Sequence, residues 1–437
     1  MQNLTNRGIQ KTMTDNIKVS ADFILHNLDY AVVYPNPYRG KGTKVGWETK
    51  ELKHVSIASK NGKIVWIGNS ADLNEKVKIE ADTYFYNGEG LLAVPGFVDS
   101  HTHLLYSGNR ADEFEMRVQG KTYLEILAAG GGILNTTNAV RNLSEEELFA
   151  ETSHRLDMAM DSGVTTIEIK TGYGLDLKNE LKMLRVIDML KEEYPLRIVT
   201  TFMGAHAVPA DRVNDSDSFV DEICQEWIPA VAETKSAVFN DVFTEKKAFS
   251  VEQSRKILNA GLKYGLKPKI HADEVNVLGG VDLAVEVGAV SADHLLMTGD
   301  EGIKKLVGSG VIPTVLPGTS TYLMESHHAP ARKMIEAGLP VAIASDHNPG
   351  SCQFLGANMI QSMAMLQLRM SASESLIAGT LHAAHAVNMG SEIGAIEVGR
   401  NMDIALFELD SFKQIGYHIG QNYLYDIIIG GEPIYKD

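Results

Sequence analysis

Strand-like apolar runs alternate with amphipathic helical patterns along most of this 437-residue chain. The helical patterns include residues 145–161, 179–194, 251–264 and 371–387. The eight strand candidates are residues 96–99, 164–169, 198–202, 238–243, 268–271, 289–294, 312–316 and 341–345. Eight strands that alternate with helices over about 300 residues predict a (β/α)8 barrel, an α/β fold of the TIM type. A doubly wound sheet is the competing fold, but no G-x-G-x-x-G pattern follows an early strand.

Patterns typical of β-structure flank the predicted barrel on both sides. Before it, strands are predicted at residues 21–33 and 55–68, with a hairpin turn at Asn61-Gly62, an exposed loop at 35–50 and a strand pair near 83–94. After it come strands at 395–407 and 425–435, with a turn at Gly430-Gly431. We predict that residues 1–94 and 395–437 form one small β-sandwich domain, and that residues 95–394 form the barrel.

Composition excludes several classes of function. A formal net charge of −16 argues against nucleic acid and against an anionic membrane surface as partners. Two cysteines, Cys224 and Cys352, are too few for a disulfide scaffold or a cysteine-based zinc module. Residues 1–15 are polar, without the apolar core of a signal peptide, and no run approaches the roughly 18 apolar residues of a membrane span. We expect a cytoplasmic enzyme or binding protein.

The segment PGFVDSHTH, residues 95–103, opens the first barrel strand. Side chains alternate faces along a strand, so His101 and His103 point the same way, as does Asp99. Two imidazoles in this arrangement can hold one divalent metal ion when further ligands come from elsewhere. His-x-His alone is a weak signal.

Polar residues follow nearly every predicted barrel strand, at the end where barrel enzymes place their active sites. Three imidazoles, from His101, His103 and His271, and one carboxylate oxygen, from Asp346, would suit a catalytic Zn²⁺ and also a ferrous ion. Glu274 and His294 are candidates for proton transfer, and Asp346 could also take a proton from the attacking water.

Several longer motifs make the interpretation specific. They are PGFVDSHTH, SGNR (107–110), AGGGI (129–133), KTGYGL, GAHAVP, HADE, SADHL, PAR (330–332) and DHNPGS. With these motifs in this order, the chain resembles the metal-dependent amidohydrolases, and within them the imidazolonepropionases of histidine degradation. The resemblance covers nearly the whole chain.

The resemblance implies a reaction, a cofactor and residue roles. The reaction is the hydrolytic opening of 4-imidazolone-5-propanoate, a small-molecule substrate, to N-formimidoyl-L-glutamate. One divalent ion per chain, zinc or iron (Fe²⁺/Fe³⁺), and a homodimer are implied. His101, His103, His271 and Asp346 match the metal ligands, and Glu274 and His294 the residues that orient and deprotonate water. Arg110 matches the residue that binds the substrate carboxylate, and the other substrate-binding positions match Tyr173, His206, Asn348, Gly350 and Ser351.

Other interpretations stay open. A purine or pyrimidine deaminase, or a different cyclic amidase, would share the metal ligands, and a non-catalytic scaffold would be expected to lose some of them. Lys170 ends the second barrel strand, whereas the metal-bridging lysine of many amidohydrolases ends the fourth; we therefore expect a single metal ion and a hydrogen-bonding Lys170 near the pocket mouth. His347 stands where the family commonly has Phe, and could alter the surroundings of the metal.

Overall fold

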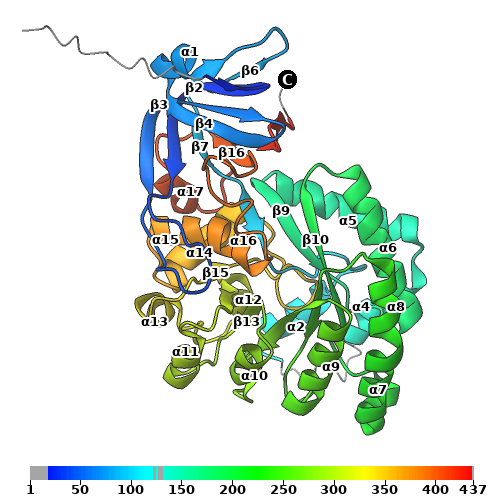
Figure 1. Ribbon diagram of the computed structural model, residues 1–437. Coiled ribbons are helices and arrows are strands. Elements are labelled where there is room, and N and C mark those ends of the chain that lie inside the picture. The colour runs from blue at the N-terminus through cyan, green and yellow to red at the C-terminus, as the bar shows by residue number, and fades with distance from the viewer. Residues whose placement is uncertain (1–17, 122–124, 126–130, 436–437) are drawn as a thin grey trace, which may run out of the picture.

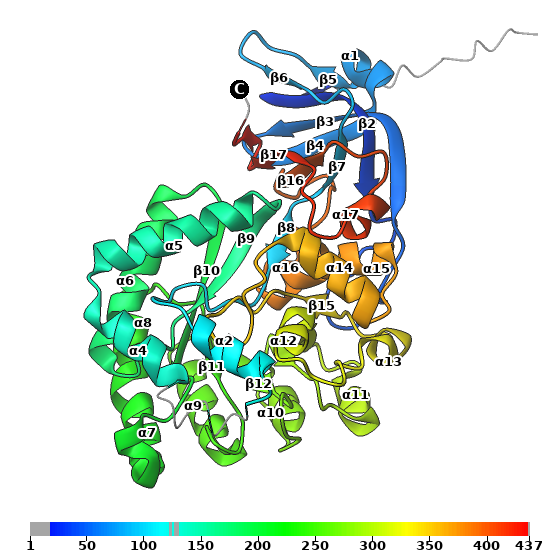
Figure 2. The same cartoon turned by 180° about the vertical axis from the view of Figure 1, so that it is seen from behind.

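The computed structural model describes residues 18–121, 125 and 131–435, and its larger part is a barrel of parallel strands (Figures 1 and 2). Each barrel strand pairs with the next in sequence order. The strands are β8 (Phe97–Asp99), β9 (Val164–Lys170), β10 (Arg197–Ala205), β11 (Phe239–Val242), β12 (Lys267–Ala272), β13 (Ser291–His294), β14 (Ile312–Val315) and β15 (Ala342–Ile343). The prediction of an eight-stranded (β/α) barrel is confirmed.

The barrel closes between β8 and β15 just beyond the carboxyl ends of these strands. The Asp346 amide donates to the His101 carbonyl at 2.9 Å, and the His103 amide donates to the His347 carbonyl at 3.0 Å. The Ser345 amide donates to the Asp99 carboxylate at 3.0 Å. The backbone that closes the barrel thus belongs to residues predicted to bind metal or to their neighbours.

Helices surround the barrel on its outer side (Figures 1 and 2). Capping boxes at Ser144, Ser250 and Ser371 begin the helices α5 (Glu145–Met160), α9 (Val251–Lys263) and α15 (Ala372–Ile377). A local sequence pattern therefore determines where these helices start. The predicted helix 371–387 is α15, a π-helical turn and α16 in succession. The helices of this part are α2 (Ala111–Val118), α4 (Ile133–Asn142), α5 (Glu145–Met160), α6 (Leu177–Glu193), α7 (Ser216–Glu222), α8 (Ile228–Thr234), α9 (Val251–Lys263), α10 (Gly280–Glu286), α11 (Asp300–Leu306), α12 (Pro317–Tyr322), α13 (Ala331–Glu336), α14 (Ala357–Gln367), α15 (Ala372–Ile377) and α16 (Ala383–Ala386).

A second sheet, built from both ends of the chain, lies beside the barrel (Figure 1). Its path runs β18-β17-β16-β7-β2-β3-β4, with β6 also paired to β2. The two ends meet where β16 pairs antiparallel with β7. The strands are β2 (Phe23–Val33), β3 (Lys50–Lys60), β4 (Lys63–Asn69), β6 (Tyr84–Asn87), β7 (Leu92–Pro95), β16 (Ile404–Phe407), β17 (Leu424–Ile429) and β18 (Glu432–Pro433).

One apolar cluster joins the two chain ends in this sheet. Leu25, Ile57 and Tyr86 from the N-terminal strands are buried together with Leu406 and Ile428 from the C-terminal strands. A small pair, β1 (Val19–Ser20) with β5 (Val77–Lys78), and the short helices α1 (Leu73–Lys76) and α17 (Lys413–Tyr417) complete this part. The shared core confirms that the terminal regions pack together.

Local details of the terminal strands differ from the prediction. The strands β6 and β7 do not pair with each other; both run parallel to β2, along its first and second halves. Strand β3 begins at Lys50, inside the predicted loop, because residues 50–53 pair with the far end of β2 despite their charges. Strand β16 begins only at Ile404. In each case a distant pairing partner, which local patterns do not reveal, decides the outcome.

No helix in the described ranges is both long and apolar enough to cross a membrane.

Candidate metal centre

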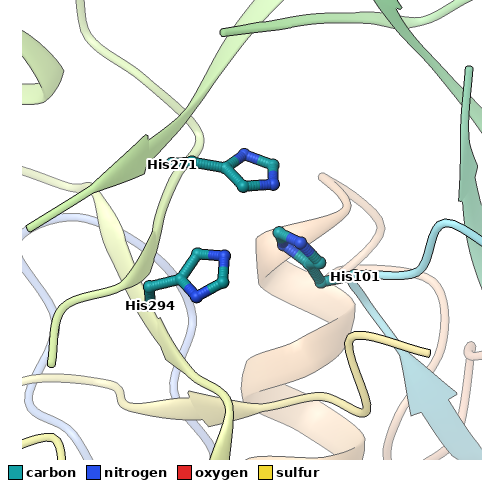
Figure 3. A group of neighbouring side chains, drawn as sticks. All are labelled: His101, His271 and His294. Atoms are coloured by element: carbon teal, nitrogen blue, oxygen red, sulfur yellow. The ribbon is translucent and has the colours of Figure 1, made fainter. Parts of the chain in front are cut away.

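Four histidines and one aspartate converge at the carboxyl end of the barrel. One ligand atom each from His101, His103 and Asp346 lies within 4.8 Å of the other two, and the same holds for His101, His271 and His294. Figure 3 shows the rings of His101, His271 and His294 facing one another. His271 Nε2 is 3.3 Å from His103 Nε2, and His101 Nε2 is 3.4 Å from Asp346 Oδ1. The structure therefore brings together all four predicted ligands, and adds His294 at ligand distance.

The chemistry of this donor set suits a metal ion. All five side chains are nearly inaccessible to solvent, and Nε2 of His101 and Nδ1 of His103 are buried without a hydrogen-bond partner. Burial holds the pKa of His101, His103 and His294 well below the usual value, so these rings are neutral and carry a free lone pair. Neutral imidazole is the form that binds metal, and a cation at the centre would satisfy the unpaired Nε2 of His101.

Two buried carboxylates set the orientation of the histidine rings. Asp293 Oδ2 lies 2.7 Å from Nδ1 of His101, and Asp241 Oδ1 lies 3.2 Å from Nδ1 of His271. A carboxylate that accepts the Nδ1 proton fixes the tautomer and directs Nε2 towards the centre. Asp241 opposes desolvation and raises the pKa of His271, the exception among the four. Thr319 donates to Asp346 Oδ2 at 2.6 Å, which leaves Oδ1 facing the histidines.

Two carboxyl groups near the histidines have raised pKa values. Burial, with Asp346 nearby, raises the pKa of Glu274 to about 8, and its Oε2 lies 3.6 Å from His294 Nε2. Burial raises the pKa of Asp346 to about 7, which a cation beside it would lower again. Strong burial at these positions gives both groups pKa values near those useful for proton transfer at neutral pH.

Backbone strain marks the loops that carry these side chains. Asp346, His294 and Asp273 adopt the left-handed region, with φ of 54°, 76° and 52°. Residues other than glycine are uncommon there, and such strain accumulates at functional sites held by their surroundings. The strained residues thus lie at the end of β13 and shortly after the ends of β12 and β15.

An aromatic wall stands on the side of His103. The His206 ring stacks on the His103 ring with centroids 4.6 Å apart, and Tyr173 lies 5.2 Å from His206. His206 Nδ1 bonds to the Gly172 carbonyl at 3.1 Å, and burial lowers its pKa to about 3. A neutral His206 with one fixed nitrogen can offer the other to a ligand. On the opposite side a pocket, bounded by Leu316, Pro317 and Thr319, opens beside Glu274 and His294.

Arg110 is held by an internal carboxylate. Its Nε and Nη2 donate to the two oxygens of Glu113 at 2.9 and 2.7 Å, and Glu113 also accepts the Gly132 amide at 3.0 Å. The remaining nitrogen, Nη1, lies against Gly350, where a β-carbon would come within 1.9 Å of it. The arginine is therefore already in carboxylate-binding geometry, with its outer edge at the Gly350 loop.

Most polar groups of the loop after β15 are hydrogen-bonded within the loop itself. The Asn348 carboxamide donates to the Asp346 carbonyl at 2.7 Å and accepts from the amides of Gly350 and Ser351 at 2.9 and 2.8 Å. Ser351 Oγ is within 2.8 Å of Asn348 Nδ2. In this conformation the Asn348 side chain shapes the loop. The loop can present its backbone groups and Ser351 to a ligand.

One expectation about a neighbouring residue was wrong. Lys170 makes the expected hydrogen bonds but does not lie near the pocket mouth: its side chain is fully buried in the barrel, at 2.7 Å from Glu168 and 2.8 Å from Asp241. His347, whose effect on the site the sequence left open, has Nε2 3.2 Å from the Tyr106 hydroxyl.

Sequence reasoning missed the groups that hold the histidines. Asp241, Asp293, Glu168 and Thr319 are all buried and bonded in this network. The available signal was a carboxylate within a predicted barrel strand, as in VTTIEIK, FNDV and SADH. Such residues are expensive to bury unless they are paired, so they mark an interior network.

Comparison with known proteins agrees with this geometry. Residues 92–433 match the amidohydrolase family. An imidazolonepropionase of Geobacillus sp. (strain WCH70) is 46% identical over 386 residues, covering 88% of this chain and 91% of that protein. An imidazolonepropionase of Brevibacillus brevis is 45% identical, over 89% of this chain and 92% of that protein.

Solved structures share the fold at low sequence identity. An adenosine deaminase from Xanthomonas campestris with bound zinc superposes with a TM-score of 0.72 at 16% identity, covering 96% of each chain. A triazine hydrolase variant gives 0.73 at 16% identity, covering 95% of this chain and 96% of the other. With a family match over most of its length and relatives above 40% identity, the chain belongs to the amidohydrolase family and, within it, to the imidazolonepropionases.

Proposed function

We propose that this chain hydrolyses 4-imidazolone-5-propanoate to N-formimidoyl-L-glutamate, the ring-opening step of histidine degradation. The observation that carries the proposal is the convergence of buried, neutral imidazoles with Asp346 at the barrel mouth, in a chain 46% identical to an imidazolonepropionase. The substrate is a small molecule with a cyclic amide and a carboxylate side chain. Both parts have candidate partners in the site.

We propose His101, His103, His271 and Asp346 as ligands of one divalent ion. When bound, such an ion supplies Lewis-acid chemistry: it lowers the pKa of a bound water and polarises a carbonyl. Three nitrogens and one oxygen suit zinc and iron alike, so Zn²⁺ and iron (Fe²⁺/Fe³⁺) are the candidate ions. His294, also within ligand distance, is kept for proton transfer because its Nε2 faces Glu274.

Glu274, His294 and Asp346 are the proposed proton carriers. In the reaction the water oxygen bonds to the ring carbonyl carbon, the carbon–nitrogen bond breaks, and the departing nitrogen takes a proton. Neutral His294 and the Asp346 carboxylate can accept a proton from the water, and Glu274, with a pKa of about 8, carries a proton at neutral pH that it can donate.

Arg110 is the proposed anchor of the substrate carboxylate. Its guanidinium already holds a carboxylate, that of Glu113. The substrate either binds at the free Nη1 edge beside Gly350 or replaces Glu113 in the fork. Tyr173 and His206 would cover the ring from the side of His103, and the Asn348–Gly350–Ser351 loop would close the site beside Arg110.

Three features of the assembly are also proposed. Residues 1–94 and 395–437 form one domain and residues 95–394 the other, supported by the apolar cluster shared by the two chain ends. A homodimer and a cytoplasmic location follow from the family resemblance, and the acidic composition suits the latter.

The test is identification of the product. Purified protein of known metal content is given freshly prepared 4-imidazolone-5-propanoate, and the products are analysed by mass spectrometry and by an ammonia assay. Formimidoylglutamate without released ammonia is the expected result. Release of ammonia from a purine or pyrimidine, with no turnover of the imidazolone, would instead support a deaminase.

A further inference from the structure

A network of five charged side chains, fully buried, lies in the barrel interior beneath the histidines. Its members come from four barrel strands, β9, β11, β12 and β13, and carry two positive and three negative charges. They are Glu168, Lys170, Asp241, Lys269 and Asp293, and each has a side-chain exposure of 0%. Ionised groups are buried at high cost unless each is closely paired, so this arrangement needs a reason beyond packing.

Lys170 is the centre of the network. Its Nζ donates to Glu168 Oε1 at 2.7 Å and to Asp241 Oδ2 at 2.8 Å, and lies 3.9 Å from Asp293 Oδ2. The other oxygen of Asp241 faces Nδ1 of His271, and a carboxylate oxygen of Asp293 faces Nδ1 of His101. One ammonium group thus stands behind the carboxylates that orient two proposed metal ligands on different strands.

Lys269 is equally buried but is bonded differently. Its Nζ donates to the carbonyls of Ser100 and Ala386 at 3.1 and 3.2 Å, and its nearest carboxylate oxygens are 3.6 and 3.8 Å away. Lys269 makes no hydrogen bond to a carboxylate that orients a histidine. The two lysines therefore form a matched pair: they have the same charge and burial, but only Lys170 is hydrogen-bonded to a carboxylate that orients a proposed ligand.

We propose that Lys170 is a positioning residue of the metal centre: it fixes Asp241 so that His271 presents Nε2 to the ion. With Lys170 in place, Asp241 Oδ2 is held by the ammonium, while Oδ1 accepts from the Val242 amide at 2.7 Å and faces Nδ1 of His271. Without Lys170, the Val242 amide alone holds the carboxylate, which can then turn away from Nδ1 of His271. The proposal rests on the ligand set proposed above.

The experiment measures Zn²⁺ affinity by chelator competition in the wild-type protein, Lys170→Met and Lys269→Met. Lys170→Met is expected to weaken Zn²⁺ binding about 10- to 100-fold, the range typical for loss of a group that supports a ligand. Lys269→Met is expected to lower thermal stability while leaving the dissociation constant within about threefold of wild type. An unchanged dissociation constant in folded Lys170→Met, or equal weakening in both variants, overturns the proposal.

A double-mutant cycle shows whether Lys170 acts through Asp241. Asp241→Asn, Lys170→Met and the combined variant are compared in Zn²⁺ affinity and in the visible spectrum of the Co²⁺-loaded protein, which reports ligand geometry. If Lys170 acts through Asp241, the combined variant binds about as weakly as Asp241→Asn alone and has the same spectrum. Additive losses would show that Lys170 acts by another route.

Folding and ligand assignment have separate controls. In Lys170→Met, buried Glu168 loses its hydrogen-bonded ammonium and keeps only that of Lys269, at 3.6 Å. If this variant does not fold for that reason, Glu168→Gln/Lys170→Met, which removes both charges, is compared with Glu168→Gln alone. Only the former is expected to bind Zn²⁺ weakly, and equal affinities would contradict the proposal. His271→Ala tests the ligand set itself: if it binds Zn²⁺ normally, the ligand set fails, whereas its loss of Zn²⁺ with normal binding by Lys170→Met refutes only the role of Lys170.

Discussion

The two sides of the site are built in different ways. On the metal side, His101, His271 and Asp346 stand at or just after strand ends, and each is held by a buried partner: Asp293, Asp241 or Thr319. On the side that would bind the substrate carboxylate, Arg110 and the loop after β15 bond to Glu113 and to the loop itself. The first arrangement leaves a nitrogen lone pair without a partner, whereas in the second the Arg110 fork is already occupied by Glu113 and only Nη1 lies outside it. A metal therefore meets a ready site, whereas the substrate carboxylate must use the Nη1 edge or displace Glu113.

Removal of a metal ligand should have the largest effect. His271→Ala is expected to lose bound metal and to lower kcat/KM by more than about a thousandfold, because the other donors remain fixed around an incomplete site. Metal content by atomic absorption and turnover on the same sample check this. His385→Ala, which removes a partly buried imidazole bonded to the Tyr38 carbonyl, is the control and should keep full metal content.

Removal of Arg110, the proposed carboxylate anchor, should have the next largest effect. Arg110→Ala is expected to raise KM about 10- to 100-fold through loss of a charged hydrogen-bond pair, with metal content unchanged. An analogue without the carboxylate should be hydrolysed equally by both proteins. Arg117→Ala removes a nearby guanidinium that donates to the Gly350 carbonyl at 3.3 Å and should change KM less. If Arg110→Ala impairs the analogue just as strongly, the anchor assignment is wrong.

Gly350→Ala tests the contact between the loop and Arg110. A β-carbon at this position would lie 1.9 Å from Arg110 Nη1, so the arginine or the loop must move. We expect KM to rise about threefold to tenfold, less than for loss of the guanidinium, with metal affinity unchanged. Loss of metal instead of substrate affinity would show that the two sides are not independent.

The last prediction concerns pH and lies outside the site. Burial lowers the pKa of His382 to about 3, and its Nδ1 bonds to the Val341 carbonyl. In the unfolded chain this histidine takes a proton near pH 6.5 and in the folded one it does not, so stability falls as pH drops below 6.5. From pH 7 to 5 the loss from this group is about 2 kcal/mol. His382→Asn should flatten the pH dependence of urea unfolding by that amount; an unaltered slope would mean that His382 titrates normally.

The sequence predicted what depends on local pattern. The eight barrel strands, the hairpin at Asn61-Gly62 and the place of the His-x-His motif follow from hydrophobic periodicity and turn residues, and the structure contains them. It could not reveal that β6 and β7 both lie along β2, because that pairing is decided over long range. Nor could the sequence place Lys170, because a lysine at a strand end does not indicate which carboxylates on other strands it will contact.

The candidate site shows the same contrast between features that local sequence predicts and features that it does not. Residue types and spacing were enough to propose His101, His103, His271 and Asp346 together, because parallel strands bring their carboxyl ends to one edge. The occupation of the Arg110 fork by Glu113 depends on where helix α2 begins, and the self-contained bonding of Asn348 depends on loop conformation; the short motifs specify neither. Prediction therefore succeeded where strands place the side chains and fell short where loops do.

The most direct measurement of the central claim is turnover of 4-imidazolone-5-propanoate as a function of metal content. Protein freed of metal by a chelator is titrated with Zn²⁺ and, anaerobically, with Fe²⁺, and activity is recorded at each step. We predict that activity rises linearly and stops at about one ion per chain, the capacity of one such N/O ligand set. Full activity in the metal-free protein, or a plateau only at two ions per chain, would contradict the account.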